Sequence, residues 1–330
     1  MIPQKSIGGY FELELRSGVV YHENALPLNT ARNAFEYILK AKKYKKAYMP
    51  YFTCSAMLEP LLKNNIPYVF YSIDAHLEPI FDFASIEEDA VFLYTNYFGL
   101  KDVYTVALSK KCKNLIIDNA QSFYSKPIMG VDTIYSPRKF FGLPDGGYLY
   151  TDTLLDYSLE KDVSYTRFTH LLKRIDLSAE EGYADFILSD ELLEHNPIRS
   201  MSHLTTKLLS SINYDSAAAQ RRINFNYLHE KLQHVNSYKF QLEDDAVPMV
   251  YPFYGSEALR KKLIENKIYT ATYWPNVKEW CTKDSLEYQL TSDVIYLPVD
   301  QRYDINTMKI IIEFITDFHY LKNVKDHMKQ

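Results

Sequence analysis

A single lysine, Lys139, lies in a segment rich in proline and glycine between two short β-like runs, residues 132–135 and 147–151. The segment, SPRKFFGLPDGG, forces a tight and irregular backbone path that would hold the lysine in one place. Most lone lysines are solvated loop residues, so that interpretation starts ahead, and the flanking prolines and glycines count against it. A lysine that is held can act as a nucleophile, because its amine forms Schiff bases with carbonyl compounds.

Two other features follow predicted strands. Asp118 comes directly after the apolar run NLII, where a carboxylate is costly unless it has a partner. Thr30, Ala31 and Arg32 follow LPLN and open a helical pattern, so backbone N–H groups and the helix dipole could face an anion. The structural alternatives are a capping aspartate and a plain N-cap threonine. Ligands of open α/β sheets bind outside the carboxyl ends of the strands, which is where these residues lie.

An amine, a carboxylate and an anion site together match the needs of pyridoxal 5′-phosphate (PLP). The amine forms a Schiff base with the aldehyde, and the carboxylate keeps the pyridine nitrogen protonated so that the ring acts as an electron sink. Once a substrate amine displaces the lysine, its free amine can move protons between Cα and the C4′ carbon. We therefore predict a PLP site formed by Lys139, Asp118 and the helix start at Thr30, Ala31 and Arg32.

The elements that must position this site follow from the hydrophobic pattern. Apolar runs alternate with helical patterns from residue 26 to 151, which indicates βα units and a mostly parallel sheet covered on both faces. The stretch 155–235 is mainly helical in pattern, and the last third mixes strand-like pieces with helices. We predict an α/β fold with a large domain, 1–215, and a smaller α+β domain, 216–330. The run GGYFELEL, residues 8–15, is predicted to be an edge strand.

Composition narrows the class of protein. Of 330 residues, 47% are hydrophobic and 24% charged, which is enough for a large core, and the net charge of −5 argues against nucleic acid as the main partner. The first residues lack the apolar core of a signal peptide, and no stretch has the length of a membrane span. The three cysteines and nine histidines lack disulfide or metal-ligand spacing. We expect a cytoplasmic protein without a metal site or a membrane partner.

The chain resembles the DegT/DnrJ/EryC1/StrS family of PLP-dependent sugar aminotransferases over most of its length, most strongly over residues 28–152. IIDNAQS resembles the family's Asp-x-Ala-Gln motif, which implies that Asp118 faces the pyridine nitrogen and Gln121 the phenolic oxygen. KFFGLPDGG resembles the family's lysine segment and implies that Lys139 is the Schiff-base lysine. LNTARNAF resembles the phosphate loop, MPYFTCSAML a strand-to-helix segment, and RRINFNYL the helix that opens the second domain. The resemblance implies the fold-type I aminotransferase architecture.

The chain departs from the family pattern at several positions. Ile134 stands where the family has a phosphate-contacting serine, and Ser136 is the predicted substitute. Cys54 stands where an aromatic side chain often stacks on the cofactor, which leaves Tyr51 or Tyr97 to cover the ring. The usual Gly-Glu before the double glycine is Pro-Asp, residues 144–145. The stretch that reaches the neighbouring subunit in the family is not recognised, and Asn213 is its candidate.

The resulting prediction is a PLP-dependent aminotransferase that moves an amino group from L-glutamate to a keto-sugar, nucleotide-linked, in surface polysaccharide or amino-sugar biosynthesis. The resemblance implies a homodimer, because in this fold the active site lies at a dimer interface. The alternatives are a non-catalytic binding protein with the same fold, and an aminotransferase or dehydratase acting on another small keto substrate. Lys139 argues against a dehydratase, because family members of that kind have a histidine in its place.

Overall fold

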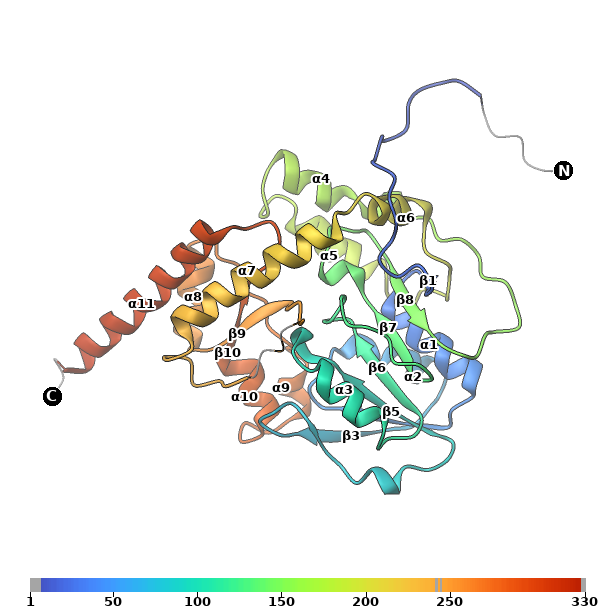
Figure 1. Ribbon diagram of the computed structural model, residues 1–330, viewed down its shortest axis with the longest axis horizontal. Helices are drawn as coiled ribbons and strands as arrows, with labels where there is room; N and C mark the ends of the chain where they lie inside the picture. Colours follow the sequence, from blue (N-terminus) through green and yellow to red (C-terminus); the bar gives the residue numbers. More distant parts are fainter. Residues whose placement is uncertain (1–6, 241–242, 244, 328–330) are drawn as a thin grey trace.

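The computed structural model describes residues 7–240, 243 and 245–327, which are built around an eight-stranded sheet (Figure 1). The strand order is β1-β8-β7-β6-β5-β2-β3-β4. The strands are β1 (Leu26–Leu28), β2 (Lys46–Pro50), β3 (Tyr68–Ile73), β4 (Pro79–Ile80), β5 (Ala90–Thr95), β6 (Leu115–Asn119), β7 (Asp132–Tyr135) and β8 (Gly147–Tyr150). The pairs among β3, β2, β5, β6 and β7 are parallel, whereas β1–β8, β7–β8 and β3–β4 are antiparallel. The predicted mostly parallel sheet is confirmed.

Helices cover both faces of this sheet, which explains why its central strands are apolar throughout. All six residues of β5, AVFLYT, are buried. One face packs against α1 (Ala31–Lys42) and α2 (Glu59–Lys63), and the other against α3 (Asp102–Ser109). α1 begins where the Thr30 hydroxyl caps it and ends at Lys43, whose φ of 58° breaks the helix.

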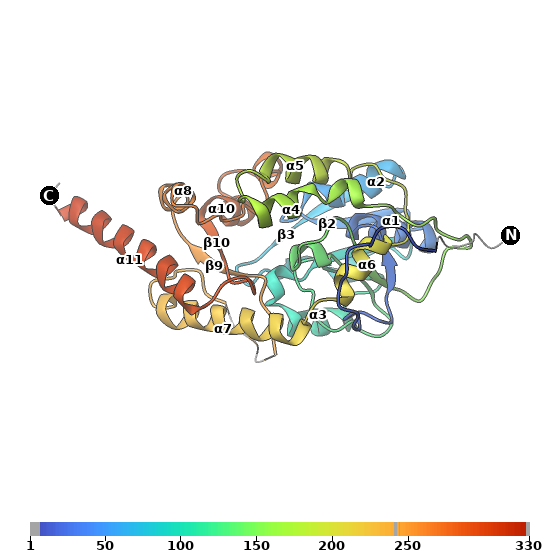
Figure 2. The ribbon, with the colours of Figure 1, turned by 90° about the horizontal axis from the view of Figure 1, so that it is seen from above.

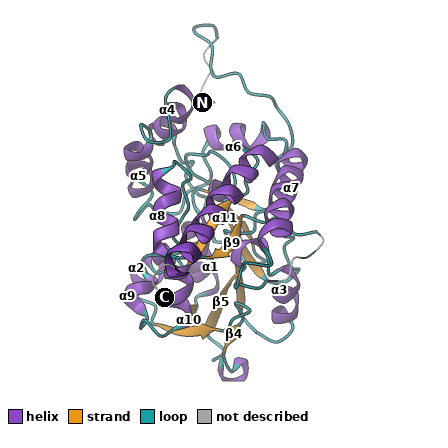
Figure 3. Cartoon of the chain, turned by 90° about the vertical axis from the view of Figure 1, so that its left-hand side faces the viewer, coloured by secondary structure: helices purple, strands orange, loops and turns teal. Residues whose placement is uncertain are grey.

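The middle of the chain is helical, as predicted. It forms α4 (Thr169–Asp176), α5 (Tyr183–Glu191), α6 (His203–Ser210) and α7 (Tyr214–Leu232). Figures 2 and 3 show α4 and α5 on the side of the molecule that carries α1 and α2, and α7 on the side of α3. The chain therefore crosses from one face of the sheet to the other between α5 and α7.

The last third of the chain forms a separate two-stranded antiparallel sheet of β9 (Val250–Tyr254) and β10 (Val294–Pro298). Its helices are α8 (Glu257–Glu265), α9 (Val277–Trp280), α10 (Leu286–Asp293) and α11 (Ile305–His327). α7 packs against α11 and β9, so it belongs spatially with this part. The predicted domain boundary after residue 215 falls in the first turn of α7.

The edge strand predicted for residues 8–15 was wrong, because this segment pairs with no strand among the described residues. Tyr10 and Phe11 are 99% and 90% exposed, and the N-terminal segment runs out from the body of the molecule (Figure 1). The outer edge of β1, to which a strand could have added, is already bridged through Leu28 by Ser200. An alternating sequence forms a strand only where a free edge accepts its backbone hydrogen bonds.

Several possible sites are absent from the described part of the chain. No helix there is long and apolar enough to cross a membrane. Over the same residues, no three His, Cys, Asp or Glu side chains cluster closely enough to hold a metal ion. All three cysteines are free.

Candidate active site

Lys139 lies in a hydrogen-bonded 3₁₀ turn, Pro137–Lys139, directly after β7. The N–H of Lys139 donates to the carbonyl of Ser136 at 3.2 Å, and the N–H of Phe140 donates to the carbonyl of Pro137 at 3.0 Å. Phe140 is buried, whereas the Lys139 side chain is exposed. Its Nζ makes no hydrogen bond or ion pair with any residue that the structure describes. The backbone of the lysine is therefore fixed while its amine stays available.

Asp118 lies in β6, beside β7, with its side chain buried. Among the described residues, its carboxylate accepts one hydrogen bond, from the N–H of Ala120 at 2.9 Å. Burial raises the pKa of Asp118 from 3.8 to about 6, against the opposing effects of the Ala120 N–H and the positive charge of Lys139. The structure thus brings Asp118 and Lys139 within electrostatic reach of each other.

Gln121, just after the carboxyl end of β6, adds a hydrogen-bond donor without a partner among the described residues. Its Oε1 accepts from the N–H of Phe98 at 3.2 Å, whereas its Nε2 is buried and bonded to nothing that the structure describes. A buried unpaired donor costs about 1–3 kcal/mol, so it needs an acceptor from elsewhere. A ring with a basic nitrogen and an oxygen substituent offers both a partner for Asp118 and an acceptor for Gln121, so these residues fit PLP.

Thr30 caps α1, which is the structural role left open by the sequence. Its hydroxyl accepts from the N–H of Asn33 at 3.0 Å and donates to the Asn33 side chain at 2.7 Å. The guanidinium of Arg32 is engaged by Glu59. At most the first two N–H groups of the helix, those of Ala31 and Arg32, are therefore left to offer an anion, and no acidic residue in the first turn opposes one.

Two glycines join this helix start to the lysine turn. The N–H of Gly146 (φ +121°) donates to the carbonyl of Asn29 at 2.6 Å, and the side chain of Pro137 packs close to Gly146. A Cβ on Gly147 would lie 2.4 Å from the carbonyl carbon of Thr30, so only glycine fits there. The turn that begins after the buried Ser136 and the start of α1 consequently lie side by side.

Asp145 anchors the end of the lysine segment. It is completely buried, and it accepts hydrogen bonds from Thr205, from Ser202 at 3.2 Å and from Arg167 at 3.3 Å. Arg167 also binds Asp162 at 2.6 Å. Burial raises the pKa of Asp145 to about 6, even though the Thr205 hydrogen bond and the positive charge of Arg167 oppose the shift. These contacts assign Asp145 a structural role.

The two aromatic candidates for covering a bound ring are already packed against protein rings. Tyr51 stacks on Phe70 with ring centres 4.7 Å apart. Tyr97 is fully buried, and its hydroxyl donates to the carbonyl of Phe52 at 3.0 Å. Trp274, which the sequence did not single out, contacts Phe52 with ring centres 5.0 Å apart.

Asn213 caps α7 by accepting from the N–H of Ser216 at 3.1 Å. A segment that sequence reasoning missed, residues 196–201, instead runs along the start of α1. The N–H of Asn29 donates to the carbonyl of Arg199 at 3.0 Å, and the side chain of Asn33 donates to the carbonyl of Asn196 at 3.0 Å. The only sequence signal was an asparagine and an arginine in a proline-containing loop, which is too common to identify a site.

No family model matches the chain, and no curated protein does either. Solved structures do. An aminotransferase of the DegT/DnrJ/EryC1/StrS type from Brucella abortus is 16% identical, with a TM-score of 0.60 over 89% of this chain and 86% of that one. The sugar aminotransferase CalS13 from Micromonospora echinospora is 14% identical (0.58; 89% and 87%). NtdA from Bacillus subtilis, with the cofactor PMP bound, is 15% identical (0.59; 90% and 73%). At this identity the likeness is one of fold, and the chain has the fold-type I aminotransferase fold of these enzymes.

Proposed function

We propose that this protein is a PLP-dependent aminotransferase of the DegT/DnrJ/EryC1/StrS type. The observation that carries the proposal is the arrangement of Lys139, Asp118 and Gln121 at the carboxyl ends of β6 and β7. It combines an exposed amine, a buried carboxylate whose pKa is raised, and a buried amide donor without a partner. The shared fold with solved aminotransferases supports the same activity.

Bound PLP would supply an electron sink for the charge that develops at the substrate Cα. Asp118 would hold a proton on the pyridine nitrogen, and the resulting ion pair would offset the desolvation that now raises its pKa. Gln121 Nε2 would donate to the phenolic oxygen. Lys139 Nζ would carry the cofactor and then move a proton between Cα and C4′.

The phosphate would lie at the start of α1, against the N–H groups of Ala31 and Arg32, with Thr30 and Ser136 beside it. Three features support this placement. Thr30 and Ser136 are buried, Gly147 leaves room for close backbone approach, and the positive end of the helix dipole favours an anion. Arg32 would contribute its N–H rather than its guanidinium, because Glu59 engages the latter.

We further propose a keto-sugar as amino acceptor, nucleotide-linked, and L-glutamate as donor. The shared fold with CalS13, a sugar aminotransferase, supports a keto-sugar as acceptor. A homodimer would complete the molecule, since a second copy could cover the apolar side chains exposed on and around α4 and α5. These are Val163, Tyr165, Leu172, Ile175, Leu177, Tyr183, Phe186, Ile187, Leu188 and Leu192.

The visible absorbance of the protein with PLP, before and after L-glutamate, tests the proposal. We expect a band from bound PLP that glutamate bleaches, and we expect Lys139→Ala to lose this bleaching. Lys126→Ala, which removes another exposed lysine, is the matched control and should behave as wild type. A wild-type protein without the band would refute the cofactor, and a band that glutamate leaves unchanged would refute glutamate as donor.

A further inference from the structure

Arg221, on α7, is a buried charged residue that contacts the lysine segment from the C-terminal part of the chain. Its side chain is 1% exposed. Its guanidinium donates to the carbonyl of Phe140 at 3.2 Å and to the carbonyl of Met249 at 3.1 Å. It also lies 4.4 Å from the centre of the Phe140 ring. Phe140 directly follows Lys139, so Arg221 holds the backbone at the end of the lysine turn by a hydrogen bond.

The contacts of this arginine are unusual for a buried charge. No carboxylate among the described residues bonds to it, and its partners are backbone carbonyls and the side chain of Gln301, which accepts from Nε at 2.8 Å. Burial lowers the pKa of Arg221 to about 10, so it is still charged at neutral pH. A buried charge is expensive unless hydrogen bonds satisfy it. Its geometry is therefore matched to these carbonyls.

Gln301 reinforces the same contact. Its Nε2 donates to the carbonyl of Phe140 at 2.8 Å, while its Oε1 accepts from Arg221. The carbonyl of Phe140 thus receives two donors, one from α7 and one from the loop after β10. The peptide that follows Lys139 is held by the C-terminal part of the chain and not only by the turn itself.

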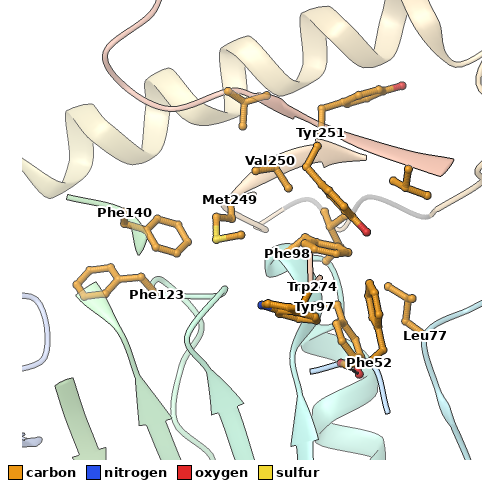
Figure 4. Packing of buried hydrophobic residues seen from close by; sticks show 14 of the residues in the cluster. Phe52, Leu77, Tyr97, Phe98, Phe123, Phe140, Met249, Val250, Tyr251 and Trp274 are labelled. Atoms are coloured by element: carbon orange, nitrogen blue, oxygen red, sulfur yellow. Dashed lines mark hydrogen bonds between the residues drawn. The ribbon is translucent and has the colours of Figure 1, made fainter. Parts of the chain in front are cut away.

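A second series of hydrogen bonds leads from Arg221 to Gln121. Arg221 donates to the carbonyl of Met249, and the N–H of Met249 donates to the carbonyl of Phe98 at 2.9 Å. The N–H of Phe98 in turn donates to Gln121 Oε1 at 3.2 Å. Figure 4 shows Met249 between Phe140, which follows Lys139 in the chain, and Phe98, which donates to Gln121.

We propose that Arg221 is a positioning residue that sets the placement of Lys139 relative to Gln121. The proposal rests on the proposed function, because it assumes that both side chains serve one bound cofactor. The two residues lie on separate loops of the large sheet, and the guanidinium is the branch point from which hydrogen bonds reach both. Removal of the guanidinium would loosen the lysine turn and leave Gln121 Oε1 bonded to a less constrained Phe98.

Hydrogen exchange of the protein without cofactor tests the positioning role of Arg221 independently of activity. The N–H groups of Phe140 and Phe141 both donate to the carbonyl of Pro137, so their exchange reports opening of the turn. In Arg221→Met we expect exchange in residues 137–143 to accelerate at least about tenfold, because a hydrogen bond to a charged group is lost. Gln301→Leu should show a smaller acceleration in the same peptide.

Arg222→Met is the matched control. Arg222 also donates to two backbone carbonyls, those of Asp245 at 3.0 Å and Ala246 at 3.2 Å, but it does not contact the lysine turn. This variant should leave exchange in residues 137–143 unchanged. The proposal would be overturned if folded Arg221→Met exchanged residues 137–143 at the wild-type rate. It would also be overturned if Arg222→Met accelerated their exchange equally. If Arg221→Met does not fold, Gln301→Leu decides by the same measure.

With PLP added, the visible absorbance of the bound cofactor gives a second test of the positioning role of Arg221. We expect the pH at which the visible band of the bound cofactor changes to move in Arg221→Met and to return only partly in Arg221→Lys, which restores a charged donor but not the planar guanidinium that reaches both carbonyls. An unmoved midpoint would contradict the positioning role. A wild-type protein that shows no band, but whose turn loosens in Arg221→Met, would refute the proposed function while the positioning role of Arg221 stands.

Discussion

Replacement of Gly147 by alanine tests whether the close approach of β8 and α1 shapes the phosphate end of the site. Gly147 begins β8, opposite Leu28 of β1. An added Cβ would lie 2.4 Å from the carbonyl carbon of Thr30, 2.5 Å from its oxygen and 2.7 Å from the nitrogen of Ala31. All three are backbone atoms, so no side-chain rotation can relieve the clash.

The magnitude follows from these distances. Overpacking a tight site costs about 1–3 kcal/mol, and we expect the upper end, about 3 kcal/mol, because backbone has to move. The strain is relieved when the first turn of α1 shifts away from β8, which displaces the N–H groups of Ala31 and Arg32. We therefore expect PLP affinity to fall at least about tenfold, equivalent to about 1.4 kcal/mol.

Denaturant unfolding and PLP titration followed by absorbance measure the two effects separately. Gly142→Ala is the matched control, since its Cβ would meet only a methyl group of Leu171 at 3.3 Å, and we expect a loss below about 1 kcal/mol. Gly147→Ala with wild-type stability and wild-type affinity would refute the close packing. Lost stability with unchanged PLP affinity would refute the placement of the phosphate at α1.

Three further outcomes are expected. Because burial raises the pKa of Asp118 from 3.8 to about 6, its contribution to stability is fully present below pH 4 and is lost as the pH rises through 6. Cofactor-free Asp118→Asn should thus be more stable than wild type at pH 7.5 by about 3 kcal/mol, and a gap that does not close toward pH 4 would contradict this. Asp145→Ala leaves Arg167 with one carboxylate fewer in a buried network and should lower the free energy of unfolding by about 3 kcal/mol, whereas exposed Asp190→Ala should lower it by less than about 1 kcal/mol. Phe186→Glu, on the exposed face of α5, should convert a dimer to a monomer in sedimentation without shifting the unfolding of the monomer, and a persistent dimer would exclude this face as the interface.

Local patterns were enough to predict most elements of the fold. The run AVFLYT reads as a strand because it is uniformly apolar and β-prone, and the structure buries all six residues. Thr30 was open between an N-cap and an anion contact, and the structure shows the cap. The predicted strand at residues 8–15 failed because a strand depends on a neighbour that no local pattern reveals.

The amino-acid sequence by itself determined which residues we propose for the chemistry and on which elements we expect them to lie. Lys139 and Asp118 stood out because proline, glycine and a preceding apolar run are local signals that act over a few residues. Only the tertiary structure decided which groups meet and which lack partners. One example is the side-chain amide of Gln121, which lacks a partner among the described residues. Others are the ion pair of Arg32 with Glu59 and the hydrogen bond from Arg221 to the carbonyl of Phe140, 81 residues away. These contacts follow from how helices pack on the sheet, and packing joins residues whose separation along the chain carries no periodic signal.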